Sequence, residues 1–134
     1  MPGPNFQPLA VITPSTGVVT VSTANTARDG TGTLTPLYTA GTSGATIARV
    51  RCIHQGAISV ASTAMVCRLW LTSGATTVMI DEVALASATP SASAIGATAT
   101  FSKTNLVLKG GDILKVTISV SESVGFCADQ GGDY

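Results

Sequence analysis

Cys52 and His54 are the residues whose types and spacing could carry reactive or metal-binding chemistry. Residues i and i+2 of a strand share a face, and Cys67 and Cys127 could add further thiols from neighbouring strands. A structural zinc site needs a full tetrahedral set of such ligands, and a Cys–His nucleophile needs a third residue that orients the histidine. Cys52 is in step with Val50, as a small buried core residue would be. We therefore expect no metal site, no cofactor and no nucleophile.

Asp81 and Glu82 are the only adjacent carboxylates in the chain. Neighbouring residues of a strand point to opposite faces, so these two side chains cannot converge on one bond as an acid and base pair would. We expect two solvated charges near a sheet edge.

Two glycine-rich segments, residues 41–44 and 110–111, lack the GxxxxGK spacing and the following helix of a phosphate-binding loop. No GxSxG motif is present to place a serine nucleophile. We expect both glycine segments to be turns, and we expect the protein not to be an enzyme.

Charge is scarce in this sequence. Only 10% of the 134 residues are charged, and seven Lys and Arg are balanced by seven Asp and Glu. Because there is no net field to attract phosphates or anionic lipid, we expect neither nucleic acid nor a membrane as a partner. Thr, Ser, Ala and Gly must then cover a surface that charged residues usually keep soluble. This composition favours a homo-oligomer or a subunit of a larger particle over a monomer.

The sequence also indicates the compartment of synthesis. No apolar run approaches the roughly 20 residues of a membrane-spanning helix. The first basic residue is Arg28, so the segment before it lacks the charged start of a signal peptide. Three cysteines are an odd number and cannot form a closed set of disulfides. We expect synthesis in a reducing cytoplasm, with the thiols free.

Apolar and polar residues alternate along most of the chain, which is the pattern of half-buried β-strands. In residues 112–120, Leu114, Val116 and Ile118 alternate with polar residues. The pattern predicts about eight or nine strands. We place them at residues 17–23, 34–40, 46–54, 64–72, 76–85, 97–102, 105–109, 112–120 and 125–128.

The segments between the strands predict the connections. Residues 73–74 and 110–111 predict two-residue hairpins, and residues 29–30 predict a turn. Residues 86–95 predict a loop or a crossing between sheets, and residues 130–134 a loose tail. The even spacing predicts an all-β fold, a single-domain antiparallel β-sandwich of about eight strands, of jelly-roll or Greek-key type. An open β-meander is the alternative.

The N-terminal segment differs from the rest because it is rich in proline. Four of the six prolines lie here: Pro2, Pro4, Pro8 and Pro14. Proline fixes φ and lacks a backbone donor, so we expect residues 1–17 to be an extended arm and residues 18–134 to be the sandwich domain. The arm also carries apolar residues that disordered tails usually lack, namely Phe6, Leu9, Val11 and Ile12. We expect them to contact a partner or a neighbouring subunit; the alternative is that they pack on their own domain.

Trp70 is the only tryptophan, and alternation places it on the outer face of strand 64–72, beside Arg68. The opposite, core-facing side holds Met65, Cys67, Leu69 and Leu71. Tryptophan and arginine together are typical of interface anchors, so we expect Arg68 and Trp70 to contact a partner or a neighbouring subunit. The alternative is that Trp70 lies under a loop, or under the arm, of its own chain.

Residues 105–118 and 124–126 resemble the strand, Gly-Asp turn and strand that end jelly-roll modules, such as trimeric modules of C1q/TNF type and viral coat-associated sandwiches. Residues 18–134 as a whole resemble small virion proteins of tailed bacteriophages. The matching segments are a YTAG turn at 38–41, an RVR strand at 49–51, an RLWL strand at 68–71, a DEV strand at 81–83 and a Gly-Gly-acidic-aromatic tail at 131–134.

This resemblance implies a capsid decoration (cement) protein on the exterior of a phage head, trimeric and without cofactor or catalytic residues. Its partners would be further copies of itself and the major capsid protein or other virion proteins, and it would assemble in the host cytoplasm. A tail or fibre-attachment component is the second hypothesis. A carbohydrate-binding module is the third, for which only Trp70, Tyr38 and Tyr134 could stack on a sugar. We expect no small-molecule ligand.

Overall fold

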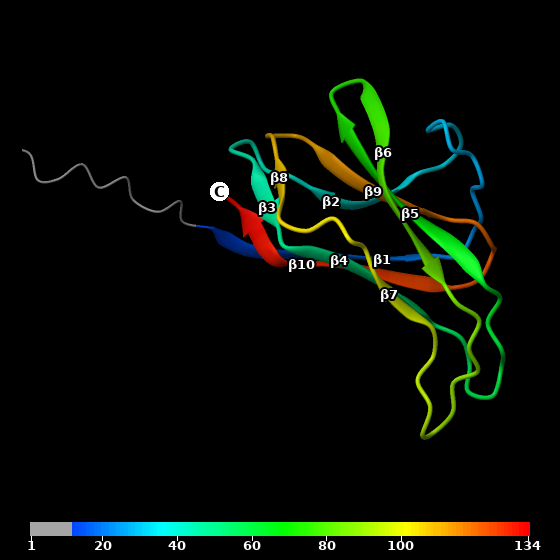
Figure 1. Cartoon of the computed structure of the whole chain (residues 1–134). Helices are drawn as coiled ribbons and strands as arrows, with labels where there is room; N and C mark the ends of the chain where they lie inside the picture. The colour runs from blue at the N-terminus through cyan, green and yellow to red at the C-terminus, as the bar shows by residue number, and fades with distance from the viewer. Residues whose placement is uncertain (1–11) are drawn as a thin grey trace, which may run out of the picture.

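The protein is described here by a computed structural model that covers residues 12–134. This part of the chain is all-β and forms two antiparallel sheets packed face to face (Figure 1). Its strands are β1 (Thr13–Val21), β2 (Thr35–Thr39), β3 (Ala45–Ile47), β4 (Arg49–His54), β5 (Met65–Ser73), β6 (Thr76–Leu85), β7 (Thr98–Thr100), β8 (Leu106–Leu108), β9 (Ile113–Ile118) and β10 (Val124–Asp133). The predicted antiparallel β-sandwich is confirmed.

The two sheets differ in size and in how the chain enters them. The large sheet has six strands in the order β7-β4-β10-β3-β8, with β1 paired to β10, and the small sheet has four in the order β2-β9-β5-β6. Among the described strands, only β5 and β6 are both consecutive in the chain and paired. Since a meander pairs each strand with the next, the meander alternative is wrong.

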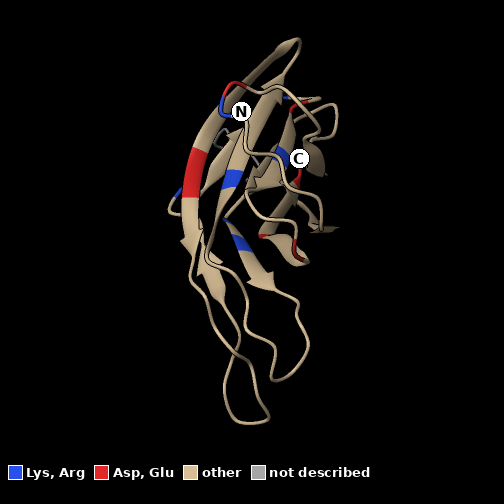
Figure 2. Ribbon diagram, turned by 90° about the vertical axis from the view of Figure 1, so that its right-hand side faces the viewer, with Lys and Arg blue, Asp and Glu red and all other residues tan. Residues whose placement is uncertain are grey.

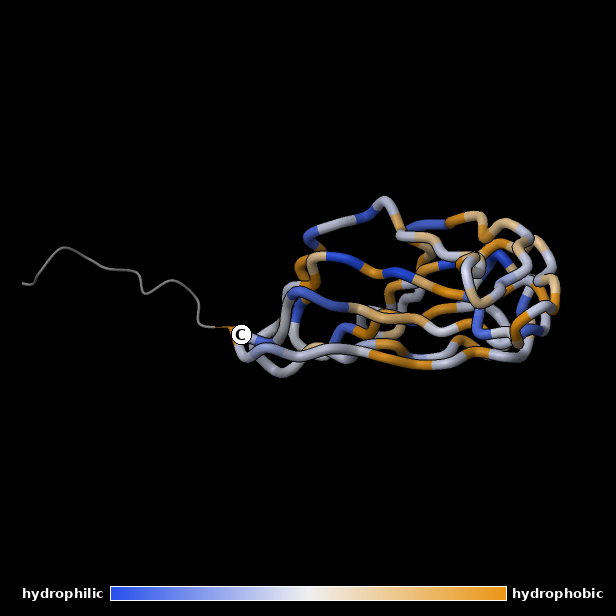
Figure 3. The backbone as a smooth tube through the Cα atoms, turned by 90° about the horizontal axis from the view of Figure 1, so that it is seen from below, coloured by the Kyte–Doolittle hydropathy of each residue, from blue (hydrophilic) through white to orange (hydrophobic). Residues whose placement is uncertain are grey.

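The core lies between the sheets and is built from residues that alternation predicted. Fully buried examples are Leu69 and Cys67 on β5 and Leu114, Val116 and Ile118 on β9. Hydrophobic and hydrophilic residues alternate along the strands that enclose this layer (Figure 3). The rings of Phe101 and Phe126 stack within it at a centroid distance of 6.5 Å. Burial of this apolar surface is the main force that holds the two sheets together.

One predicted hairpin is confirmed and the other is wrong. Strands β5 and β6 pair through Ser73 and Thr76, with Gly74 at a positive φ of 60° in the turn. After residues 110–111, by contrast, the chain leaves the large sheet, where β8 pairs with β3, and enters the small sheet, where β9 pairs with β2 and β5. A Cβ on Gly110 would lie 2.2 Å from the carbonyl oxygen of Thr42. This glycine therefore packs the turn against a second turn instead of closing a hairpin.

The long strand predicted at residues 46–54 is divided into β3 and β4. The break is at Ala48, whose carbonyl oxygen accepts a hydrogen bond from the backbone N–H of Asn105.

The predicted loose tail at residues 130–134 is also wrong, since β10 continues to Asp133. A Cβ on Gly131 would lie 1.9 Å from the oxygen of Thr46, and one on Gly132 would lie 1.8 Å from the oxygen of Thr13. The glycines thus let the end of β10 lie close to strands on both sides.

The N-terminal boundary also differs from the prediction. Residues 13–17, which we assigned to the arm, belong to β1 and pair with β10, with Thr13 opposite Asp133 and Gly17 opposite Ala128. The predicted arm residues Phe6, Leu9 and Val11 lie outside the described residues. Ile12, the last arm residue before β1, is exposed.

Candidate functional site

Trp70 lies on the outer face of the small sheet and is nevertheless only 1% exposed. Its predicted exposure is wrong, and the alternative that its own chain covers it is confirmed. The loop between β1 and β2 lies over this face, because Arg28 binds Glu82 there and Gly30 lies beside Thr77. Alternation identified the face of Trp70 correctly, but it could not show that a connection distant in sequence covers that face.

Arg68, the second predicted anchor, is buried beside Trp70 and binds its own chain. Its Nε donates to Oε1 of Glu82 at 2.9 Å, and Arg28 from the covering loop donates to the same carboxylate. The hydrogen bonds from Arg28 and then from Arg68 lower the pKa of Glu82. Glu82 therefore ties the loop to the sheet, and neither Arg68 nor Trp70 has surface to offer a partner.

Asp81 and Glu82 diverge, as their adjacent positions predict, but both have protein partners. Asp81 accepts hydrogen bonds from the hydroxyl of Ser102 at 3.1 Å and from the backbone N–H of Lys103 at 3.0 Å. Glu82 is bound by the arginines on the other face. The expected place of both charges near a sheet edge is confirmed, because β6 is an edge strand and Glu82 is exposed. Asp81 in addition links this edge of the small sheet to the β7–β8 connection.

Cys52 and Cys67 come from opposite sheets and meet in the core. Both are buried, which confirms Cys52 as a small core residue. The neighbouring Cys52 thiol, together with burial, raises the pKa of the Cys67 thiol. Cys127 is half-buried on the far side of the large sheet, and all three cysteines are free.

His54 is held at one end of the sandwich by fixed partners. Its Nε2 lies 2.7 Å from Oε1 of Glu122, and its Nδ1 accepts the backbone N–H of Gly56 at 3.1 Å. The same glutamate oxygen accepts the backbone N–H of Thr63 at 3.1 Å. These bonds fix the loop that follows β4. Within residues 12–134, no three His, Cys, Asp or Glu side chains gather as a metal-binding group.

Two long loops extend the sandwich at the end where His54 lies. Residues 55–64 and 86–97 are bonded together by backbone hydrogen bonds from Ser59 to Pro90 and from Ser62 to Ala88, both 2.8 Å. Neither loop contains a charged residue, and the lower part of Figure 2 shows this extension entirely in tan. We call this pair of loops the loop tip.

The loop tip presents aliphatic side chains to solvent. Ile58, Val60 and Ile95 are between 55% and 82% exposed. Strand alternation missed them because they lie in connections. Their sequence signal is the presence of isoleucine and valine within charge-free runs of small residues.

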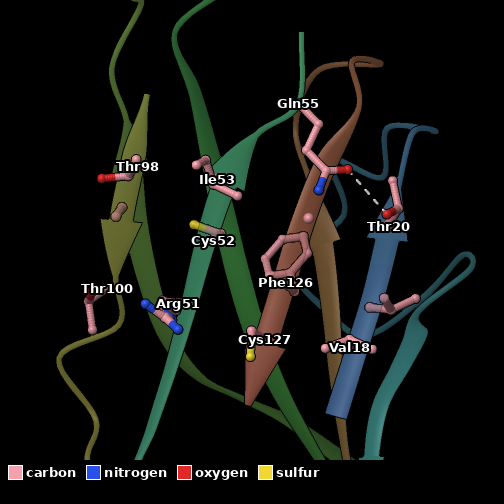
Figure 4. A pocket seen from close by; sticks show the side chains of 13 residues that line it. Val18, Thr20, Arg51, Cys52, Ile53, Gln55, Thr98, Thr100, Phe126 and Cys127 are labelled. Carbon is pink, nitrogen blue, oxygen red and sulfur yellow. Dashed lines mark hydrogen bonds between the residues drawn. The ribbon is translucent and has the colours of Figure 1, made fainter. Parts of the chain in front are cut away.

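A groove of about 670 Å³ lies on the outer face of the large sheet (Figure 4). Four neighbouring strands, β1, β10, β4 and β7, line it. Val18 is 71% exposed on β1, and Arg51 lies opposite it on β4, with Cys127 of β10 between them. Ile53 lies further along β4, opposite Gly125. We call this feature the sheet groove.

The two arginines beside the sheet groove share one carboxylate, which leaves one net positive charge there. Asp129 binds Arg49 at 2.8 Å and Arg51 at 3.1 Å. The hydrogen bond from Arg49 is the main cause that lowers the pKa of Asp129. The groove therefore offers thiol, hydroxyl and aliphatic surface, with Arg51 as the only charged residue among the described residues that line it.

No family model matches this chain, and no curated protein or solved structure is significantly similar to it. Residues 12–134 include no helix that is long and apolar enough to cross a membrane.

Proposed function

We propose that this chain is a non-enzymatic structural protein of a virus particle, a decoration protein that binds the outside of a phage head as a homo-oligomer, most simply a trimer. The observation that carries the proposal is the loop tip, a charge-free projection with Ile58, Val60 and Ile95 in solvent. The centres of protein interfaces are depleted of charge, because unpaired charges are costly to dehydrate. The loop tip has this composition, and we assign it as the surface that binds the protein shell of the head.

The position of the arm supports attachment at two points. Residues 1–12 precede Thr13, which pairs with Asp133 at one end of β10, whereas His54, at the base of the loop tip, pairs with Val124 at the other end. A sandwich of jelly-roll or Greek-key type with a proline-rich arm at one end can bind the shell with its loop tip and a neighbour with its arm. Weak contacts repeated by symmetry then stabilise the whole shell.

A carbohydrate-binding role has less support. Such a module needs exposed aromatic rings for stacking, and Trp70 and Tyr38 are both buried. Of the three aromatics considered, only Tyr134 is exposed.

Co-sedimentation with purified heads and purified tails of the virus that encodes the chain tests the proposal. We expect the wild-type protein to sediment with heads at a fixed stoichiometry and not with tails. Ile58→Asp combined with Ile95→Asp should abolish this binding, because each carboxylate would have to be dehydrated at the shell.

Val107→Asp is the matched control, because Val107 is 75% exposed on β8, outside the loop tip. It should bind heads as the wild type does. If the wild type ignores heads, or if both variants bind equally well, the assignment is wrong. Sedimentation with tails alone would support the tail component instead.

A further inference from the structure

The sheet groove has the shape of a channel that follows the strands. Its floor is β10, which contributes only Gly125 and the small side chain of Cys127 to this face. Longer side chains stand on both sides, Val18 on β1 and Arg51 and Ile53 on β4 (Figure 4). Because floor and walls run along the strand direction, the channel fits an extended peptide better than a compact ligand.

One end of the channel is crossed by a side chain. Gln55 lies over Gly125, where a Cβ would come within 2.5 Å of its Nε2, and its Oε1 accepts the hydroxyl of Thr20 at 3.3 Å. An entering peptide therefore lies on the open part of the channel, over Cys127.

The N-terminal arm has the chemistry that this channel would accept. Residues 1–12 carry no charged side chain, and the groove presents the aliphatic side chains of Val18 and Ile53. Proline favours the extended polyproline II conformation, in which residues about three apart lie on one side. Phe6 and Leu9, which flank Pro8, have this spacing and could both point into the channel.

The arm is too short to place these residues in the groove of its own chain. Pro14 keeps Thr13 extended, and the β-branched run before it disfavours a tight turn, so the first favourable place for a reversal is Pro8. A reversal there would bring Phe6 opposite Val11, which precedes the groove residue Val18 in the chain. An extended arm of 12 residues, by contrast, spans about 40 Å and can reach another molecule.

We propose that the sheet groove of one copy of this chain receives Phe6 and Leu9 from the arm of a neighbouring copy. The contact is head-to-tail, so repeating it closes a ring where the rotation permits, and the trimer of the proposed function is one such ring. This inference rests on the self-association included in the proposed function, but not on head binding.

Cys127 provides a native probe, because Cys52 and Cys67 are buried. In the Leu9→Cys variant, oxidised glutathione should form a disulfide between position 9 of one chain and Cys127 of another. Non-reducing gels would then show covalent multimers, and peptide mapping would identify the linked pair. The double variant Leu9→Cys with Cys127→Ser should lose this link, and Val107→Cys, exposed on β8, should not form it.

A second measurement needs no engineered thiol. Deletion of residues 1–11 should leave the far-UV circular dichroism unchanged, convert the oligomer to monomers, and speed alkylation of Cys127 by N-ethylmaleimide about tenfold or more. An intramolecular link, absence of any link in the folded variant, or an unchanged alkylation rate would overturn the inference. If the deletion variant still binds heads, the proposed function stands without this contact; if the link forms and heads are not bound, the contact stands without the proposed function.

Discussion

The indole Nε1 of Trp70 donates a hydrogen bond to Oγ1 of Thr117 on the adjacent strand β9, at a distance of 3.0 Å. Both residues are buried on the outer face of the small sheet, under the loop between β1 and β2. The small sheet is therefore covered on both faces, by the main core on one and by its own connection on the other. Trp70 therefore stabilises the fold, and its substitution should lower the free energy of unfolding.

Trp70→Ala should lower the free energy of unfolding by about 3–5 kcal/mol, because a large buried side chain is removed. Trp70→Phe should cost less, since it keeps much of the packing but removes the bond to Thr117. Urea denaturation followed by circular dichroism measures both values, and Val107→Ala on the exposed surface should change stability by less than about 0.5 kcal/mol. Unchanged stability of Trp70→Ala with lost self-association would restore the interface-anchor hypothesis.

Stability should fall in acid, in part through Glu82. Its pKa in the folded protein is lowered by Arg28 and Arg68, whereas in the unfolded chain it has the ordinary value of about 4.3. The pairing therefore stabilises the fold above that value, and this contribution is lost as the pH falls through the lower folded-state pKa.

Glu82→Gln should accordingly destabilise the protein at pH 7 and have little effect at about pH 2, where the wild-type carboxylate is itself protonated. Urea titrations of both proteins at several pH values check this expectation. An equal loss of stability at both extremes would show that Glu82 acts through packing and not through its charge.

The three thiols should react at very different rates. Cys127 is half-buried at the surface, whereas Cys52 and Cys67 are buried in the core and out of reach of the reagent. In the variant lacking residues 1–11, iodoacetamide should label one cysteine under native conditions and all three in denaturant. Mass spectrometry of the intact protein counts the labels, and rapid native labelling of Cys52 or Cys67 would contradict the core assignment.

Gly131→Ala should separate the end of β10 from its neighbour. The new methyl group would lie 1.9 Å from the carbonyl oxygen of Thr46, so the backbone must move, and we expect a loss of about 3 kcal/mol or more. Gly74→Ala is the control, because open space surrounds that position, and only its positive φ of 60° is unfavourable, by about 1–2 kcal/mol. Comparable unfolding midpoints for the two variants would contradict the role of Gly131.

Local patterns predicted local structure well. Strand β6 has the predicted bounds, because its β-branched residues and the turn at residues 73–74 are both contained in one short stretch. The turn at residues 110–111 was also recognised, but turn glycines specify a reversal and not the strand that will become the partner. That choice depends on β2, β3 and β5, which are far away in sequence.

The candidate surfaces were harder to predict, for the same reason. The sheet groove forms only when β1, β4, β7 and β10 lie side by side. Its shape therefore cannot be predicted from any one segment of the sequence. The cover over Trp70 likewise comes from a loop whose residues show no alternation. Sequence patterns indicate which face a side chain takes, while its exposure depends on elements brought together by the whole fold.

Strand β10 pairs with β1, β3 and β4 and is thus the hub of the large sheet, although it is the last strand of the described chain. During translation, the earlier strands of that sheet leave the ribosome before the strand that joins them exists. The large sheet cannot close until Asp133 has emerged from the exit tunnel, so the strands made before β10 must wait for it. A ribosome stalled before residue 124 would hold a chain whose apolar strands are still unpaired and open to chaperones.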